Sequence, residues 1–353
     1  MADPERAERA GVVIVGAGAA GLAVAAALRD HDPLILDRAE RVGDSWRRRY
    51  AGLRLFTPAR YCALPGRPLP LDPDAYPGKD EYADYLEEYG TALPARLRMG
   101  TDVLGHRYHD GRHLLVTSGG LIAADRLVWA GGAHTRPVLP PFTGDLDRQV
   151  HQRHSAALGD LAELPPGPVL VVGAGQSGAD IALAASAGHR TYLAGRHTGT
   201  LPLPVARSRS LRAVYGLPAP GGPIRRFLLS RGSPLIRTTA RHLVEAGVLR
   251  VPRVIGARDG LPRLADDRVL PVSTVIWCTG LRPDLGWLDP HAAAPEHRRG
   301  VSTALPGLTY VGLRLQRTLN SGFLAGMPGD AAYVARHLNP TVPNRFDEST
   351  RRP

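Results

Sequence analysis

Two runs of consecutive apolar residues stand out along the chain, and spaced glycines follow each of them. The first run is Val12–Val15, and an unbroken apolar run is typical of a strand buried on both faces of a parallel sheet. The alanine- and leucine-rich stretch Leu22–Leu28 predicts a helix, and Leu34–Leu36 predicts a second strand. The sequence therefore predicts a strand, helix, strand unit near its start.

The glycines between the first strand and its helix have the spacing GxGxxG, at Gly16, Gly18 and Gly21. The first glycine of this spacing permits a tight turn, the second lets a pyrophosphate approach the backbone, and the third lets the helix pack close to the strand. The helix amino terminus then offers free N–H groups to the phosphates. Asp37 ends the second strand, where a carboxylate accepts hydrogen bonds from an adenosine ribose. We expect a dinucleotide to bind here.

The same pattern recurs in the second half of the chain. The apolar run Val169–Val172 is followed by a helix predicted over Ala179–Ala187 and a strand predicted over Thr191–Ala194. Candidate cofactor-binding residues in the turn between the first strand and the helix are Gly173, Gly175, Ser177 and Gly178. The last strand leads into the cationic pair Arg196 and His197, which would meet a ribose 2′-phosphate. This pair favours NADPH over NADH.

The repeated unit predicts an α/β fold with two Rossmann-like dinucleotide-binding domains. Two further buried strands are expected over Leu127–Trp129 and Val275–Trp277, each ending in small residues. Turn signals within Thr101–Arg126 predict a small hairpin ribbon. The proline-rich stretches Pro137–Pro141 and Pro165–Pro168 cannot be helical, and we expect them to mark crossings between the domains.

Length, composition and cysteine spacing exclude several other classes of protein. A length of 353 residues corresponds to about two domains, and 43% apolar with 22% charged residues is ordinary for a globular protein. No apolar run is long enough to span a bilayer and the first residues do not form an export signal, so a cytoplasmic location is expected. Cys62 and Cys278 are too far apart in the sequence to suggest a disulfide framework or a zinc cluster, and no metal site is predicted.

The net charge of +11 raises the question of nucleic acid as a partner. Of the 44 basic residues only Lys79 is lysine, and the arginines are spread through every segment instead of forming one basic arm. We therefore expect no nucleic-acid partner. The densest basic stretch, Arg207–Arg241, has two interpretations, a solvated basic helix or an amphipathic contact with a membrane surface or an acidic partner.

Other catalytic motifs are missing from the sequence. It contains no HExxH, GxSxG or GxxxxGK[ST], so nothing indicates zinc proteolysis, α/β-hydrolase chemistry or ATP hydrolysis. The carboxylates between Glu81 and Glu88 are at helical spacing beside Tyr82, Tyr85 and Leu86. They are interpreted as the polar face of an amphipathic helix, not as an acid–base pair.

Four further motifs resemble those of the class B flavoprotein monooxygenases, the group of flavin-containing monooxygenases and Baeyer–Villiger enzymes, in particular its short bacterial branch. The segment Gly43–Trp46 resembles the group's GGxW, and Leu53–Pro65 resembles its stretch that lines flavin and substrate. Trp277–Pro283 resembles its ATGxRP, and Ser321–Asp330 resembles its carboxy-terminal flavin contact. With both glycine turns, the resemblance covers nearly the whole chain.

This resemblance implies FAD in the first turn, NADPH in the second, and an NADPH domain inserted into a discontinuous FAD domain. The implied domains are 1–155 and 282–353 for FAD and 156–281 for NADPH. Asp37 would bind the FAD ribose, and Arg196 would bind the 2′-phosphate of NADPH. The other implied FAD-binding residues are Gly43, Asp44, Trp46 and Asp330.

The implied activity is oxygenation of a small organic nitrogen, sulfur or carbonyl compound by O₂ through a flavin C4a-(hydro)peroxide. Phe56 and Thr57 would lie near the reacting flavin, with Phe56 where many relatives have an asparagine. For a carbonyl substrate, Arg54 or Arg60 would stabilise an anionic peroxide. No nucleophilic side chain is required.

One signature departs from the family pattern. When the histidine of FxGxxxHxxxY is aligned with His154, Arg148 and Val150 occupy the positions of phenylalanine and glycine. Two alternatives therefore stay open, an NAD(P)H-dependent flavoprotein reductase or oxidase without oxygen insertion, and a non-catalytic dinucleotide-binding protein.

Overall fold

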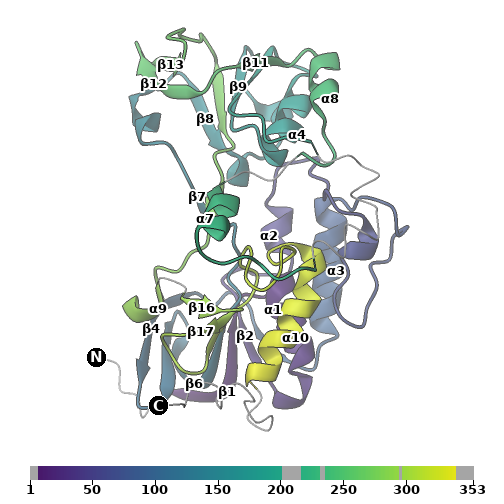
Figure 1. Ribbon diagram of the computed structural model, residues 1–353, viewed down its shortest axis with the longest axis vertical. Helices are drawn as coiled ribbons and strands as arrows, with labels where there is room; N and C mark the ends of the chain where they lie inside the picture. Colours follow the sequence, from purple (N-terminus) through teal and green to yellow (C-terminus); the bar gives the residue numbers. More distant parts are fainter. Residues whose placement is uncertain (1–6, 201–215, 231–234, 294–295, 339–353) are drawn as a thin grey trace.

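The chain folds into two main sheets built largely from parallel strands, and helices pack against each of them (Figure 1). The computed structural model describes residues 7–200, 216–230, 235–293 and 296–338. The larger sheet lies in the lower body of Figure 1 and the smaller sheet in the upper body. The predicted α/β fold with two Rossmann-like units is confirmed.

The larger sheet is centred on β1 (Glu8–Val15), which pairs in parallel with β2 (Leu34–Leu36) and with β6 (Gly120–Trp129). Val13 and Ile14 are fully buried, as the unbroken apolar run predicts. Strands from both ends of the chain meet in this sheet, so the unit is discontinuous. Its other strands are β3 (Arg96–Arg98), β4 (Val103–His109), β5 (Arg112–Thr117), β16 (His297–Arg298), β17 (Val301–Ser302) and β18 (Leu308–Tyr310). The predicted ribbon is the antiparallel meander of β4, β5 and the start of β6.

Helices α1 (Ala19–Ala27), α3 (Lys79–Thr91) and α10 (Met327–Leu338) pack together on one side of this sheet (Figure 1). Helix α1 starts directly after its N-cap Gly18, three residues before the predicted start. In α3, Tyr82 and Leu86 are buried, which confirms the amphipathic helix. The shorter helices are α2 (Asp44–Arg47), α9 (Pro290–Ala293) and the 3-10 turns Arg29–His31, Ala59–Tyr61, Pro141–Asp145, Ser155–Ala157, Leu161–Glu163 and Leu324–Gly326.

The smaller sheet has five parallel strands in the order β11, β10, β9, β14, β8. Their bounds are Leu249–Val251, Thr191–Ala194, Val169–Val172, Thr274–Trp277 and His151–His154. Helices α4 (Gln176–Ala185) and α8 (Ala240–Glu245) contact each other, and α4 packs on β9 and β10. An antiparallel hairpin of β12 (Val254–Arg258) and β13 (Leu261–Leu264) is attached to this unit.

Two passages of the chain between the units pair with each other as β7 (Arg136–Pro137) and β15 (Leu281–Arg282). The first passage is where proline-rich Pro137–Pro141 begins. The second proline-rich stretch is not a crossing, because Pro165–Pro168 lies between β8 and β9 of one sheet. Since β8 belongs to the smaller sheet, that sheet begins before the predicted boundary at residue 155. We propose that the inserted unit extends from the end of β7 to the start of β15.

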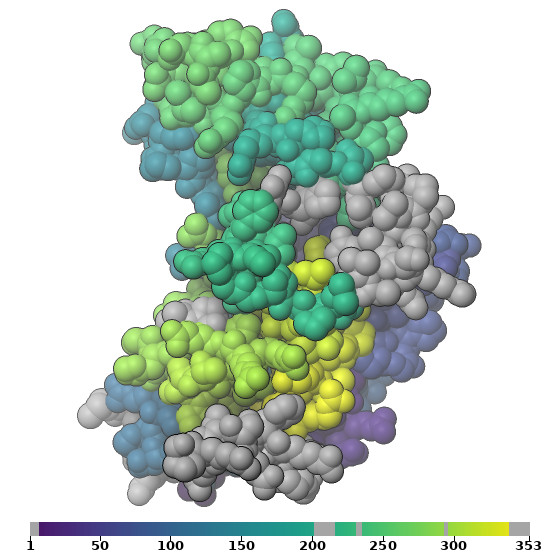
Figure 2. Space-filling view, viewed as in Figure 1, coloured from purple at the N-terminus to yellow at the C-terminus, as the bar shows by residue number. Residues whose placement is uncertain are grey.

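Helix α7 (Gly222–Ser230) lies on the surface between the two bodies (Figure 2). It is part of the arginine-rich stretch, and all its residues are exposed or half-buried. Residues 207–215 and 231–234 of that stretch lie outside the described residues. In the ranges that the structure describes, every helix is too short or too polar to cross a bilayer.

Candidate functional site

The first glycine turn is shaped by close backbone contacts. Gly16 has φ +114°, in the left-handed region, and its N–H donates to the Leu36 carbonyl at 2.7 Å. A Cβ on Gly16 would lie 2.4 Å from the Ala130 carbonyl oxygen, and one on Gly21 would lie 1.8 Å from the Gly16 oxygen. These two glycines are therefore required for packing, because no side-chain atom fits at either position.

Gly18 differs from these two glycines. It has extended backbone angles at the N-cap of α1, and a Cβ added there would meet no protein atom within 4 Å. The free N–H groups of the first turn of α1 face this open space, and such an arrangement binds phosphates. The space beside Gly18 is thus open, and its use as a pyrophosphate cradle stays a prediction.

Two carboxylates of the first unit are fixed in place. The Asp37 side chain accepts from the backbone N–H groups of Ala17 at 2.7 Å and of Ala39 at 2.8 Å, which holds it beside the glycine turn. Asp330 is fully buried in the first turn of α10, and its Oδ1 accepts from Arg317 Nε at 2.9 Å. Burial raises the pKa of Asp330, while Ser321 and Arg317 oppose this shift, and its Oδ2 has no hydrogen-bond partner within 3.5 Å.

A buried carboxylate oxygen without a donor is rare in folded proteins. The Oδ2 of Asp330 would accept a hydrogen bond from a ligand hydroxyl, as the sugar-like chain of FAD offers. The first unit therefore fits FAD by two independent features, an open phosphate cradle and an unpaired buried acceptor. Sequence reasoning missed Arg317, the partner of Asp330, because no motif position marks it.

The segment Gly43–Trp46 has largely local structural roles. Gly43 has φ +90°, and a Cβ there would lie 2.4 Å from the Ala83 oxygen, so glycine lets α2 pack on α3. Asp44 accepts from the Arg41 N–H at 3.2 Å and pairs with Arg47 at 3.4 Å. Both residues thus stabilise the start of α2. Trp46 is half-buried, with its ring edge-on to Tyr82 at 5.1 Å, and its flavin contact stays a prediction.

The three residues predicted near the reacting flavin have different surroundings. Phe56 packs edge-on against Phe323 at 6.1 Å, so the structure joins its segment to the one that leads into α10. Thr57 Oγ1 lies 3.2 Å from Cys62 Sγ. Arg54 is on the surface, where it donates to the Tyr76 carbonyl at 3.0 Å. A catalytic role of Arg54 stays a prediction.

The second glycine turn repeats the geometry of the first. Gly173 has φ +111°, and a Cβ there would lie 2.2 Å from the Cys278 oxygen. A Cβ on Gly178 would lie 1.7 Å from the Gly173 oxygen, whereas one on Gly175 would meet nothing within 4 Å. Ser177 is exposed in the first turn of α4. The second cradle is therefore also open to a pyrophosphate.

A buried polar network behind this second turn was not predicted. Asp180 of α4 accepts from Gln176 Nε2 at 2.9 Å and from the Thr238 hydroxyl, and it pairs with Arg237 at 3.3 Å. The side-chain amide oxygen Oε1 of Gln176 also accepts from the Ile236 N–H at 2.8 Å. The network ties residues 236–238 to α4. Its members are far apart in the sequence, so no local pattern could reveal it.

Loss of the Asp180 carboxylate should destabilise the second unit. Asp180→Ala leaves the Thr238 hydroxyl and the Arg237 guanidinium without their acceptor, and we expect the free energy of unfolding to fall by about 3 kcal/mol. Glu245→Ala is the matched control, because this carboxylate of α8 also pairs with an arginine, Arg241, but is 54% exposed. Its expected cost is below about 0.5 kcal/mol. Equal urea midpoints for the two variants would contradict the prediction.

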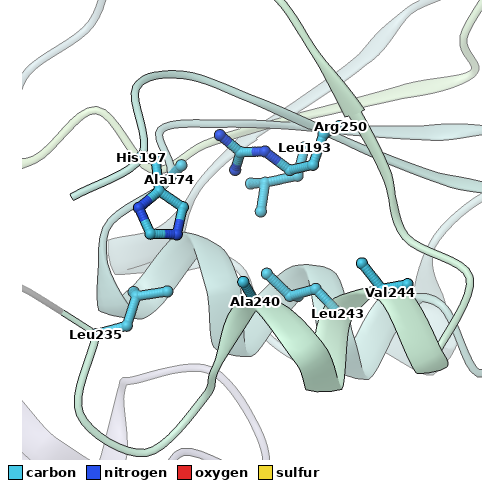
Figure 3. Close-up of a pocket in the computed structure, with 8 residues that line it drawn as sticks. All are labelled: Ala174, Leu193, His197, Leu235, Ala240, Leu243, Val244 and Arg250. Carbon is cyan, nitrogen blue, oxygen red and sulfur yellow. The ribbon is translucent and has the colours of Figure 1, made fainter. Parts of the chain in front are cut away.

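An apolar pocket adjoins the second turn (Figure 3). His197 and Arg250 lie on one side of it, opposite α8. Its aliphatic wall consists of Ala174, Leu193, Leu235, Ala240, Leu243 and Val244. Arg196 and His197 directly follow Gly195 and are exposed. Arg250 was not predicted, because it comes from β11, which only the sheet brings beside β10.

The residues after α2 connect the two units. Tyr50 is buried among core residues of the second unit, and the Ala51 N–H donates to the Gly159 carbonyl at 3.0 Å. Arg49 Nη2 donates to the His134 carbonyl at 3.3 Å, beside the first passage between the units. The two glycine turns are thus parts of one connected structure.

The cysteines are not arranged for thiol chemistry. Cys62 and Cys278 are free, and burial raises their thiol pKa values to about 11 and about 12. Both are therefore protonated at neutral pH, and the thiolate is the reactive form. Among the residues that the structure describes, no group of three histidine, cysteine or acidic side chains could hold a metal ion.

Comparisons with known proteins agree with this geometry. Residues 13–214 match the family model of the pyridine nucleotide-disulphide oxidoreductases. An uncharacterized CzcO-like oxidoreductase from Geobacillus kaustophilus is 33% identical over 93% of this chain and 97% of its own length. The indole-3-pyruvate monooxygenase YUCCA1 of Oryza sativa subsp. japonica is 34% identical over 49% of this chain and 44% of its own.

Among solved structures, a flavin-containing monooxygenase from Stenotrophomonas maltophilia has the same fold, with a TM-score of 0.77 and 24% identity over 94% of this chain and 98% of that one. The glycine turns, the family match and the CzcO-like relative together place the protein among the oxidoreductases. The chain belongs to the pyridine nucleotide-disulphide oxidoreductase family, in the class B flavoprotein monooxygenase group that its motifs predicted.

Proposed function

We propose that this protein is an NADPH- and O₂-consuming flavoprotein monooxygenase that acts on a small organic nitrogen, sulfur or carbonyl compound. FAD and NADPH are the cofactors that the family confirms. The observation that carries the proposal is the pair of open glycine cradles at Gly18 and Gly175. At each of these glycines a helix begins after the carboxyl end of a parallel strand, and folds of this class bind nucleotides at that position.

In this proposal the first cradle binds the FAD pyrophosphate, and Asp37 binds the adenosine ribose. The Oδ2 of Asp330 would accept a hydrogen bond from a hydroxyl of the flavin side chain. Bound FAD would supply the redox chemistry, with hydride from NADPH and oxygen from O₂. Phe56 and Phe323, which pack together where the chain leads into α10, would exclude water from the reacting flavin. The chain supplies binding, orientation and a dry site.

The closest alternative is a reductase. Relatives of this fold include a bacillithiol disulfide reductase, but Cys62 is buried, Cys278 is half-buried, and both are free and protonated at neutral pH. Reduction of a disulfide through an internal thiol pair is therefore not favoured. The monooxygenase names of the rice relative and the S. maltophilia neighbour support oxygenation instead.

The proposal is tested by following oxygen. Purified yellow protein is mixed with NADPH in air-saturated buffer, alone and with panels of amines, thioethers and ketones, while O₂ uptake and hydrogen peroxide are measured. We expect at least one panel member to be oxygenated and to lower the peroxide released per O₂ consumed. Full conversion of O₂ to hydrogen peroxide with every compound would instead identify an NADPH oxidase. A colourless protein that FAD does not stabilise would indicate a non-catalytic binding protein.

A further inference from the structure

We propose that the surface segment 217–229, which includes most of α7, docks the protein onto an anionic lipid surface. This inference goes beyond the proposed function and does not depend on it, because none of these residues belongs to either glycine turn. The segment lies on the surface between the two bodies (Figure 2). The proposal rests on the charge of this part of the sequence, on the exposure of its apolar side chains and on the contacts that hold it in place.

Nearly all of the net positive charge comes from one part of the sequence. Arginines occur throughout the chain, but between Asp180 and Glu245 there are ten arginines and no acidic residue. Since the whole chain has 44 basic and 33 acidic residues, the rest of it holds 34 basic and 33 acidic residues. The 217–229 segment lies inside the stretch that carries the excess charge. A stretch with this charge attracts an anionic surface.

Apolar side chains are exposed at high density in this segment. Of the ten large apolar side chains that are strongly exposed among the described residues, four lie here, and they are Leu217, Ile224, Phe227 and Leu229. Ile224 is 62% exposed, whereas the adjacent Arg225 is half-buried, with its Nη2 at 3.4 Å from His297 Nε2. A surface helix normally turns its apolar residues inward and its charges outward. Helix α7 does the reverse at these two positions, which leaves Ile224 available to a partner.

Backbone hydrogen bonds hold the start of the segment on the larger unit. The Ala219 N–H donates to the Arg317 carbonyl at 2.9 Å, and the Leu319 N–H donates to the Leu217 carbonyl at 3.1 Å. The two stretches run antiparallel to each other. Leu217 is 53% exposed in this arrangement, and it cannot turn inward unless these bonds break. The segment is therefore presented to the outside by the fold itself.

A lipid surface fits these features better than an acidic macromolecule does. The acyl chains beneath the headgroups would cover the aliphatic side chains of Leu217 and Ile224, whereas the carboxylates of an acidic protein or the phosphates of a nucleic acid would not. The exposed Arg226 would lie at the level of the anionic headgroups. With nine residues, α7 can lie in the interface but is too short to cross a bilayer.

Sedimentation with lipid vesicles tests the proposal on the full chain. Vesicles of phosphatidylcholine are compared with vesicles of equal parts phosphatidylcholine and phosphatidylglycerol. We expect the protein to bind the anionic vesicles at least about tenfold more strongly than the neutral ones, and we expect added salt to weaken this binding. Equal affinity for both kinds of vesicle, or binding to neither, would overturn the proposal.

Two variants locate the contact on α7. Ile224→Ser should weaken binding to the anionic vesicles at least about tenfold, because its aliphatic side chain is no longer buried by lipid, and Arg226→Gln should weaken it about fivefold. Leu104→Ser and Arg107→Gln are the matched controls, because both residues are exposed on β4 of the larger unit, Leu104 to 60%. Both controls should bind as the wild type does. Equal weakening by the variants and their controls would place the contact elsewhere and overturn the proposal.

Competition separates a lipid surface from an acidic macromolecule. Polyglutamate and duplex DNA are added to the vesicle-bound protein and to the Ile224→Ser variant. If the variant binds the anionic vesicles as well as the wild type and either polyanion displaces both proteins, the segment binds acidic macromolecules by charge alone and the lipid proposal is wrong. Melting temperatures confirm that each variant is folded.

Discussion

Gly21→Ala is expected to abolish the stable fold of the FAD-binding unit. The added Cβ would lie 1.8 Å from the Gly16 carbonyl oxygen, and both groups are backbone-fixed in the turn between β1 and α1. Relief requires α1 to move away from the sheet, which would open the core around Leu22 and Val24. We expect a loss of at least about 3 kcal/mol in the free energy of unfolding, seen as insoluble protein or a greatly lowered urea midpoint.

Gly18→Ala is the matched control, because the same methyl group there meets no protein atom within 4 Å and the backbone angles suit alanine. We expect this variant to fold with a nearly unchanged urea midpoint as apoprotein but to bind FAD at least about tenfold more weakly, since the methyl group occupies the space of the pyrophosphate. Full FAD retention by Gly18→Ala would show that the cradle is not the phosphate site.

The second large prediction concerns a buried pair of histidines in the β-meander. His113 Nε2 lies 3.0 Å from the Pro306 carbonyl oxygen, which can only accept, so this nitrogen carries the proton. Its Nδ1 then accepts from His106 Nε2 at 3.0 Å, and His106 Nδ1 accepts from the Asp289 N–H at 3.1 Å. Both rings are therefore neutral, and every ring nitrogen has a partner.

Acid should break this chain of hydrogen bonds. Burial lowers the pKa of both His106 and His113 to about 4, with the Asp289 carboxylate opposing the shift in His106 and Arg126 adding to it in His113. The unfolded chain takes up these protons near pH 6.5, so the stability is complete above that pH and is lost as pH falls toward 4. Each histidine contributes as much as about 3 kcal/mol to this loss.

Urea unfolding at pH 7.5, 5.5 and 4.5 measures the effect. We expect His113→Gln to be less stable than wild type at pH 7.5 but to lose less stability on acidification, because one titrating group is gone. The exposed His31 provides the control, and His31→Gln should follow the wild-type pH dependence. Parallel pH profiles for wild type and His113→Gln would contradict the assignment.

The candidate site was predictable where its residues act through the backbone of one short segment. The turns at Gly16 and Gly173, with their left-handed φ angles, follow from local spacing, and the structure has both. Prediction was poorer where a residue's role depends on what lies opposite. Arg317 matched no motif position, yet it pairs with the buried Asp330.

The sequence by itself determined both units of strand, turn and helix, because the apolar run, the glycine spacing and the helix-forming stretch of each unit lie within about 25 residues. Only the tertiary structure decided that β8 joins the smaller sheet, that Pro165–Pro168 is no crossing, and that Arg250 of β11 stands beside Gly195. The physical reason is that strand order and side-chain neighbours are set by burial of whole faces, which brings together residues that no local pattern connects.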